Sequence, residues 1–516
     1  MKKLVKLIAL PTAVLCLAAA LCACGGGKPG NTNKPDSNDG SPAPDGAKDG
    51  IVVAIAQDLG ESLDPHRMEA AGTREVLFNV FEGLVKPDSE GNLLPAVARE
   101  YVVSDSGDVY TFKLREGVRF HNGELVTVGD IVYSLRRCMG EFGDVTVDGF
   151  DVVEKVEAEG SDTVVIRLTK SSPAFLAALT AAIIPENYAD QATAPVGTGP
   201  FRFVSRAAQE NLVLERFDDY WGEKAKLKTV TFKIIENPST LVLSLKSGAV
   251  DLCSHLTAVQ AAELGSEFEI LEGTMNLVQA VYLNNAVEPL NNLKVRQAMS
   301  YAIDRSQIML YLADGRGTAV GSSIYPAFGK YFMPELVDYY QYDPQKAKSL
   351  LAEAGYPNGF DLEITVPSAY QPHMDTATVV VEQLRAIGIN ASIKAVEWSA
   401  WLKDTYQGRD FQATVIGFDA KNLTAGAMLD RWRSDASGNM INFNNAEYDQ
   451  TLDKACASVD DAEQTALYKR CEAILTEQAA NLYIQDMCDL VAIKAALGGW
   501  KFYPLYAMDL STVYYK

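Results

Sequence analysis

The sequence predicts a mixed α/β protein with at least two α/β lobes, because strand patterns alternate with helix patterns in two regions of the chain. Residues 109–114, 163–168 and 227–235 alternate apolar and polar side chains with the period of a strand. A helix is expected over residues 343–355, with Asp343 as its N-cap and apolar side chains three and four positions apart.

The remaining body elements follow the same logic. The run at residues 51–55 is short and apolar, which predicts a buried strand at the start of the body. A second helix is expected over residues 376–387, with Gly388 at its end, and a strand is expected over residues 391–396. Strand and helix therefore succeed each other again in the second half of the chain.

The first residues predict export from the cytoplasm. A lysine-rich start precedes an almost wholly apolar run over residues 7–23, which is short for a membrane span and typical of a signal peptide. Residues 21–25 read LCACG and resemble the bacterial lipoprotein signal. The resemblance implies that Cys24 is lipidated and becomes the mature N-terminus after residues 1–23 are removed. The alternative is an ordinary signal peptide with an incidental cysteine.

Residues 24–50 are expected to form a lipid-anchored flexible tether. Seven Gly and four Pro lie between residues 25 and 50, and the only apolar side chains there are two Ala. Such a segment cannot bury enough apolar surface to offset the entropy of ordering it. We therefore expect a protein that is held at the membrane surface by its lipid anchor. Its globular body would act in the space outside the membrane.

Charge and composition narrow the classes of partner. The chain has 516 residues, with 46 Lys and Arg against 67 Asp and Glu, which gives a net charge of −21. Loss of the three lysines in the signal changes this to −21 − 3 = −24. A polyanion such as nucleic acid would be repelled over most of that surface. Hydrophobic residues at 48% and charged residues at 22% are typical of a globular protein.

The sequence contains no established catalytic or metal-binding motif, so no catalytic residue, metal or cofactor is expected. No HExxH, GxSxG, phosphate-binding loop or CxxC motif occurs in the chain. The four histidines show no metal-ligand spacing; they are His66, His121, His255 and His373. These absences favour a binding protein over an enzyme.

Five cysteines remain after the signal and the lipidation site are set aside. An odd number leaves at least one free thiol even outside the cell. Proximity in sequence favours a disulfide between Cys456 and Cys471, although sequence cannot place their Cα atoms. Most of the five are expected to be buried apolar side chains.

A series of short motifs runs along the body. In order, they read ESLDPHRME (61–69), VFEGLV (80–85), GNLLPA (91–96), YTFKLREGVRFHNGE (110–124), DIVYSL (130–135), PVGTGPFRF (195–203), DYWG (219–222), SGAVD (247–251), KVRQAMSYAIDR (294–305), YDPQKAK (342–348) and LAEAGYPNG (351–359). The ordered set resembles the large solute-binding proteins of bacterial ABC importers, specifically the family 5 peptide/nickel group.

The resemblance implies a periplasmic-binding-protein-like fold, in which two α/β lobes are joined by two hinge strands. Lobe one would cover residues 51–285 and carry an extra subdomain at about 86–192. Lobe two would cover residues 286–484, and residues 485–516 would return to lobe one. The first crossing is expected near residues 281–285. Ligand binds between the lobes in this family, and the lobes close by hinge motion.

One stretch of the expected cleft departs from the family pattern. Oligopeptide-binding members meet the peptide amino group with the Asp of a Gly-Trp-x-x-Asp stretch, which here matches Gly417 to Lys421. Phe418 replaces the Trp, and Lys421 replaces the Asp. A buried ammonium favours a carboxylate or another anion, so recognition of a free amine is in doubt. Asp419 could substitute if the loop is rearranged, and Lys421 could instead face solvent.

Other cleft positions also follow from the resemblance. Trp398 matches a Trp that lies flat against the ligand, although a core role is an alternative. Tyr406 falls where the family places a polar contact, and Glu69 matches an acidic cleft residue. Ser254 and His255 lie where cleft-lining residues are found, and His255 fits a structural histidine equally well.

The function implied by the resemblance is an extracytoplasmic solute-binding lipoprotein that delivers a short peptide to the membrane subunits of an ABC importer. An anionic or non-peptide solute is the alternative that Lys421 suggests. Nickel is a minor alternative, because His373 is the only histidine in lobe two and its place does not match. Two alternatives to a transport function remain: a surface receptor or adhesin, and a secreted hydrolase.

Overall fold

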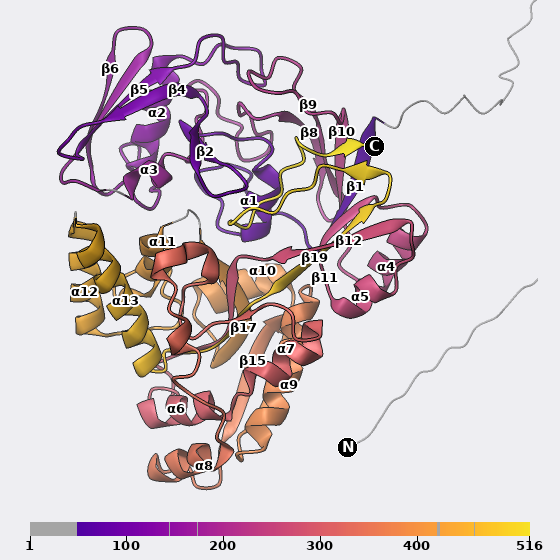
Figure 1. Ribbon diagram of the computed structural model, residues 1–516, viewed down its shortest axis with the longest axis vertical. Helices are drawn as coiled ribbons and strands as arrows, with labels where there is room; N and C mark the ends of the chain where they lie inside the picture. Colours follow the sequence, from indigo (N-terminus) through magenta and orange to yellow (C-terminus); the bar gives the residue numbers. More distant parts are fainter. Residues whose placement is uncertain (1–48, 144, 173, 421–423, 459) are drawn as a thin grey trace, which may run out of the picture. The chain divides into compact units, whose positions relative to one another are not determined.

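The computed structural model describes residues 49–143, 145–172, 174–420, 424–458 and 460–516. The expected signal peptide, Cys24, nearly all of the tether and Lys421 lie outside these residues. Residues 48–516 form one compact unit. Its mixed α/β architecture, with two large sheets, confirms the predicted fold class (Figure 1).

A seven-stranded mixed sheet forms the core of the first lobe, in the order β12-β19-β11-β1-β10-β9-β8. The central strand β1 pairs in parallel with β10 and β11, whereas the outer pairs are antiparallel. Its strands are β1 (Gly50–Ile55), β8 (Phe201–Ala207), β9 (Asn211–Arg216), β10 (Thr229–Ile234), β11 (Leu252–Leu256), β12 (Phe268–Thr274) and β19 (Cys488–Lys494). The helices α1 (Ala71–Leu77), α4 (Pro238–Lys246) and α5 (Ala258–Ala262) contribute apolar side chains to the two hydrophobic clusters of this lobe.

A four-stranded antiparallel sheet with its own hydrophobic core lies between β1 and β8 in sequence. It consists of β4 (Ala98–Val103), β5 (Val109–Leu114), β7 (Thr163–Leu168) and β6 (Val153–Glu159). Helix α2 (Val128–Cys138) packs on it and begins with a capping box between Thr127 and Asp130. This region also contains α3 (Phe175–Ala178), β2 (Val85–Pro87) and β3 (Leu93–Pro95).

The second lobe is built on a six-stranded sheet, in the order β14-β18-β13-β17-β15-β16. Its strands are β13 (Leu277–Leu283), β14 (Thr318–Ala319), β15 (Asp361–Pro367), β16 (Asn390–Val396), β17 (Ala413–Asp419) and β18 (Asn481–Asp486). The helices α6 (Leu293–Ala302), α7 (Arg305–Ala313), α8 (Pro344–Glu353) and α9 (Gln371–Arg385) pack with it in one apolar cluster. Helix α8 begins at the expected N-cap, since Asp343 accepts hydrogen bonds from two backbone amides.

A second apolar cluster of this lobe gathers the short helices and the C-terminal helix pair. Its elements include η1 (Pro326–Tyr331), α10 (Trp398–Ala400), the π-helix η3 (Trp401–Gln407), α11 (Ala425–Leu429), η4 (Asp430–Trp432), α12 (Ala446–Ala457) and α13 (Asp461–Glu477). The disulfide favoured from the sequence is not formed, because Cys456 and Cys471 are both free. Cys471 is enclosed in this cluster, and the Cys456 Sγ atom lies 3.9 Å from the Tyr468 hydroxyl.

The chain passes between the two large sheets twice. The first passage is at Met275 and Asn276, between β12 and β13, and the second is at Met487, between β18 and β19. The Met275 amide donates to the Met487 carbonyl at 2.9 Å, so the two passages lie side by side. The first passage therefore precedes the expected position at 281–285, because β13 is a mostly apolar strand that is buried along its whole length and fits either sheet by pattern alone.

The chain ends on the first lobe. Strands β20 (Leu497–Gly498) and β21 (Tyr514–Tyr515) pair there, and the Tyr515 hydroxyl donates to the Gly50 carbonyl at 2.9 Å. Tyr506 lies in the segment between these two strands. Its side chain packs against Met275 and Met487, where the chain passes between the two large sheets.

Candidate functional site

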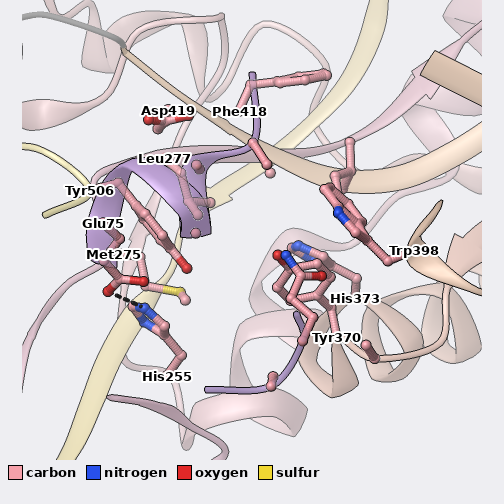
Figure 2. A pocket seen from close by; sticks show the side chains of 18 of the residues that line it. Glu75, His255, Met275, Leu277, Tyr370, His373, Trp398, Phe418, Asp419 and Tyr506 are labelled. Atoms are coloured by element: carbon pink, nitrogen blue, oxygen red, sulfur yellow. Dashed lines mark hydrogen bonds and ion pairs between the residues drawn. The ribbon is translucent and has the colours of Figure 1, made fainter. Parts of the chain in front are cut away.

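A cavity of about 600 Å³ lies where the two lobes face each other. Its lining from the first lobe includes α1, the end of β1 and β11, and its lining from the second lobe includes β17, η3 and η4. Figure 2 shows side chains from both groups around one space. The volume is in the range of sites that enclose small organic ligands.

An ion pair joins the two lobes at the edge of this cavity. Arg74 lies on α1 of the first lobe, and Asp419 is the last residue of β17 in the second lobe. The Arg74 Nη2 atom donates to both carboxylate oxygens of Asp419, at 2.8 and 2.7 Å. Both side chains are largely buried, with exposed fractions of 19% and 8%. Asp419, which could have replaced the missing amine-binding Asp only if the loop were rearranged, is therefore already paired with a cation.

A second cluster of charges, between β11, β19 and α1, lies within the first lobe. His255 Nδ1 lies 3.0 Å from Asp489. His255 Nε2 lies 2.9 Å from Glu75, as the dashed line in Figure 2 marks. Burial opposes the positive charge, but the two carboxylates outweigh it and raise the pKa of His255 well above its usual value. Tyr506 stacks on the imidazole with ring centroids 4.8 Å apart. The imidazole is thus held in place on both ring nitrogens and on one face.

We expect this cluster to make stability fall at alkaline pH. Because the folded-state pKa of His255 is raised, its contribution is complete below the unfolded pKa of about 6.5 and is lost as pH rises through the folded pKa. Urea unfolding of the wild type and of His255→Gln at several pH values above 6 should show the difference in unfolding free energy shrinking as pH rises. A difference independent of pH would contradict a charged His255.

Aromatic side chains form much of the wall on the second lobe. Trp398 stacks on Trp401 with centroids 5.1 Å apart, and the buried Trp401 Nε1 donates to Thr414 Oγ1 at 2.9 Å. Tyr370 packs edge-on against Trp398, with centroids 5.5 Å apart. The anchored Trp401 therefore holds the partly buried Trp398 ring as a flat surface at the cavity.

His373 adds one hydrogen-bond donor to this wall. Its Nδ1 atom lies 2.9 Å from Gln279 Nε2, and the amide oxygen of Gln279 accepts from Gln485. Nδ1 is therefore the acceptor, and the proton is on Nε2. Burial lowers the pKa of His373 to about 3, so the ring is neutral at physiological pH.

The structure brings seven of the eight expected site residues together. They are Glu69, Ser254, His255, Trp398, Tyr406, Gly417 and Asp419, and all of them line this cavity. Their contact with ligand stays a prediction. A Cβ atom on Gly417 would lie 2.5 Å from Leu277 Cδ1 on the neighbouring strand, so a larger residue there would displace the Leu277 side chain. Lys421, the eighth, lies outside the described residues.

Several cavity residues were not identified from the sequence. Glu75, Tyr370, Arg431 and Tyr506 also line the cavity, and Arg74 pairs with Asp419 at its edge. None belongs to a motif with recognisable spacing, so only the fold reveals their position. Within the described parts of the chain, no group of three or more His, Cys, Asp or Glu is arranged to hold a metal ion.

Two lobes, two passages between their sheets and a cavity at their junction define the class of two-lobed solute-binding proteins. The family model for bacterial extracellular solute-binding proteins, family 5 (middle region), matches residues 92–440. The chain belongs to this family, which confirms the resemblance seen in its motifs. Members are solute-binding components of ABC importers that act outside the cytoplasm, and the protein is accordingly a transport component and not an enzyme.

Two curated relatives illustrate the similarity. Heme-binding protein A of Haemophilus influenzae is 29% identical over 75% of this chain and 77% of its own. The dipeptide-binding protein of Escherichia coli is 26% identical over 80% of this chain and 84% of its own. The ligands in their names differ, so membership of the family does not by itself identify the ligand of this protein.

Two solved structures extend the similarity to the whole body. The periplasmic binding protein DppA of Helicobacter pylori, in complex with the peptide STSA, has a TM-score of 0.81 and 26% identity over 90% of this chain and 98% of its own. The binding protein AgaA of Agrobacterium tumefaciens, in complex with agropinic acid, has a TM-score of 0.81 and 27% identity over 90% and 99%. In the part of this chain that the structure describes, no helix is long and apolar enough to span a membrane.

Proposed function

We propose that the protein binds short peptides in the cavity between its lobes and delivers them to the membrane subunits of an ABC importer. The observation that supports this most directly is the cavity itself, which combines flat aromatic surfaces with polar and charged side chains and is lined by residues of both lobes. A peptide needs this combination, because its backbone requires hydrogen bonds while its side chains vary. The dipeptide-binding relative and the peptide complex of the structural neighbour support the same ligand class.

Binding would couple to closure at the two passages between the sheets. Met275 and Met487 are adjacent there, and few residues would have to change conformation for the lobes to separate. A ligand that contacts α1 and β17 together stabilises the closed form, because it touches both lobes only when they are close. The closed form would then present the surface that the importer recognises.

The ligand can be identified directly. Denaturing the purified soluble body and analysing the released solute by mass spectrometry should yield a set of short peptides. A single recurrent non-peptide compound would contradict the peptide assignment. A small acid is the second candidate, because Arg431, which has no carboxylate partner among the described residues, also lines the cavity.

We also propose that Cys24 carries the lipid anchor and that the segment after it is the tether. Replacing Cys24 with Ser in the full chain should release the protein from the membrane fraction, since two or more acyl chains are what make anchoring stable. Fractionation followed by immunoblotting measures this, with Cys22→Ser as the matched control that should stay on the membrane. Retention of the Cys24 variant on the membrane would contradict lipidation at this position.

A further inference from the structure

Arg431 differs from the other charged groups around the cavity. It lies in η4 and lines the cavity, and its guanidinium carbon is 4.0 Å from the centroid of the Phe418 ring. Among the described residues, the guanidinium has no ion-pair partner, and its buried Nη1 atom has no hydrogen-bond acceptor. By contrast, Asp419 is paired with Arg74, and Glu75 with His255. Arg431 is therefore a cation of the cavity wall that forms no ion pair with a described residue, although the Asp148 and Asp430 carboxylates line the same cavity.

A second unused donor lies beside it. A Cβ atom built on Gly438 would be 3.6 Å from the Tyr406 hydroxyl and 3.9 Å from Arg431 Cγ, so both side chains reach the same corner. Tyr406 also lines the cavity, and its hydroxyl makes no hydrogen bond with a described residue. Tyr406, Phe418, Arg431 and Gly438 together are called the Arg431 corner below.

The acidic side chains next to Arg431 in sequence do not neutralise it. Asp430 and Asp435 both lie within ion-pair distance of Arg433, at 3.9 and 3.2 Å, and Arg433 also pairs with Asp453. Arg433 is not part of the cavity lining. The two arginines of this turn therefore have different roles, one engaged with local carboxylates and one facing the cavity.

The chemistry of the corner fits an anion with two oxygens. A guanidinium offers parallel N–H groups that match a carboxylate, and its contact with the Phe418 ring restrains its position. The Tyr406 hydroxyl adds one more donor at the same place. We propose that Arg431 is a specificity-determining residue that binds a carboxylate of the ligand, which for a peptide is its C-terminal carboxylate. This inference rests on the proposed function, because it names the residue that would bind one end of the proposed peptide ligand.

The test compares ligands with and without that carboxylate. Ligand-stripped soluble body, as wild type, Arg431→Gln and the control Arg433→Gln, is titrated with pools of tri- to pentapeptides that carry a free or an amidated C-terminus. Loss of a paired, charge-assisted hydrogen bond typically costs at least about tenfold in affinity. We expect the wild type and the control to prefer the free acids by at least about tenfold, and Arg431→Gln to lose that preference. Tyr406→Phe, which removes one hydroxyl, should reduce the preference severalfold and serves if Arg431→Gln does not fold.

The outcomes separate this inference from the proposed function. Equal affinity of the wild type for acids and amides, or an unchanged preference in Arg431→Gln, would overturn the role of Arg431. If neither pool binds, the peptide assignment fails, and the solute released by denaturation is then tested as itself and as its methyl ester. Weaker binding of the ester would support Arg431 as a carboxylate site. A solute without a carboxylate, or equal binding of the ester, would overturn it.

Discussion

Replacing Arg74 with Met is expected to open the two lobes and to weaken ligand binding by about a hundredfold or more. In the closed arrangement the variant leaves the Asp419 carboxylate without its cation, although that side chain is only 8% exposed. Removing one partner of such a buried pair typically costs about 3–5 kcal/mol, and each 1.4 kcal/mol is a factor of ten. Opening lets water reach Asp419, so the cost falls on closure and spares the folding of either lobe.

Small-angle scattering of the soluble body should show a larger radius of gyration for Arg74→Met than for the wild type under the same conditions. Arg202→Met is a suitable control, because Arg202 pairs with Glu215 on the exposed surface of the same lobe. Adding Asp419→Asn to the Arg74 variant should restore part of the closure, since no unpaired charge then remains. Identical scattering and affinity in all of these variants would show that the ion pair does not hold the lobes together.

Replacing Arg137 with Met is expected to lower the free energy of unfolding of the first lobe by about 3–5 kcal/mol. Two guanidinium nitrogens of Arg137 donate to the two carboxylate oxygens of Asp64, at 3.0 and 2.6 Å. Both side chains are 7% exposed, so the variant would leave a buried carboxylate whose remaining cation, Arg67, approaches it only at 3.8 Å. Asp64 belongs to the motif at residues 61–69, which gives that motif a structural role in this protein.

The pH dependence gives a second check on this pair. Burial raises the pKa of Asp64, but hydrogen bonds and attraction from Arg137 outweigh burial and lower it overall. A lowered folded-state pKa means that the stabilisation is present above the unfolded value of about 3.9 and is lost as pH falls through the folded pKa. Urea unfolding should therefore show a large difference between wild type and variant at pH 7, and a smaller one below pH 4.

Arg136→Met is the matched control for this prediction. Arg136 is adjacent on α2 and its side chain is 40% exposed; it approaches Glu141 at 3.8 Å and donates to the Val156 carbonyl at 3.3 Å. Exposed pairs of this kind contribute at most about 1 kcal/mol. A cost for Arg137→Met that is no larger than the cost for Arg136→Met would contradict a stabilising buried pair.

Local sequence patterns predicted many of the secondary-structure elements. The alternating runs at 109–114 and 163–168 are β5 and β7, and the run at 227–235 contains β10. The helix expected from residue 376 begins earlier, at Gln371, because Pro372 in the first turn is compatible with a helix start. Such patterns are readable because periodicity, caps and turns depend on residues a few positions apart.

The sequence by itself determined the fold class, the family and most of the stretches that reach the cavity. Only the tertiary structure decided which charges of the cavity remain available to a ligand. Arg74 and Asp419 are 345 positions apart, and His255 and Asp489 are 234 apart, so no local pattern links them. A buried carboxylate can bind a ligand amine if no cation of the protein lies beside it. If the fold places an arginine there, the same carboxylate becomes part of a structural ion pair. For this reason Asp419 is already paired, whereas Arg431 keeps its charge free for the ligand.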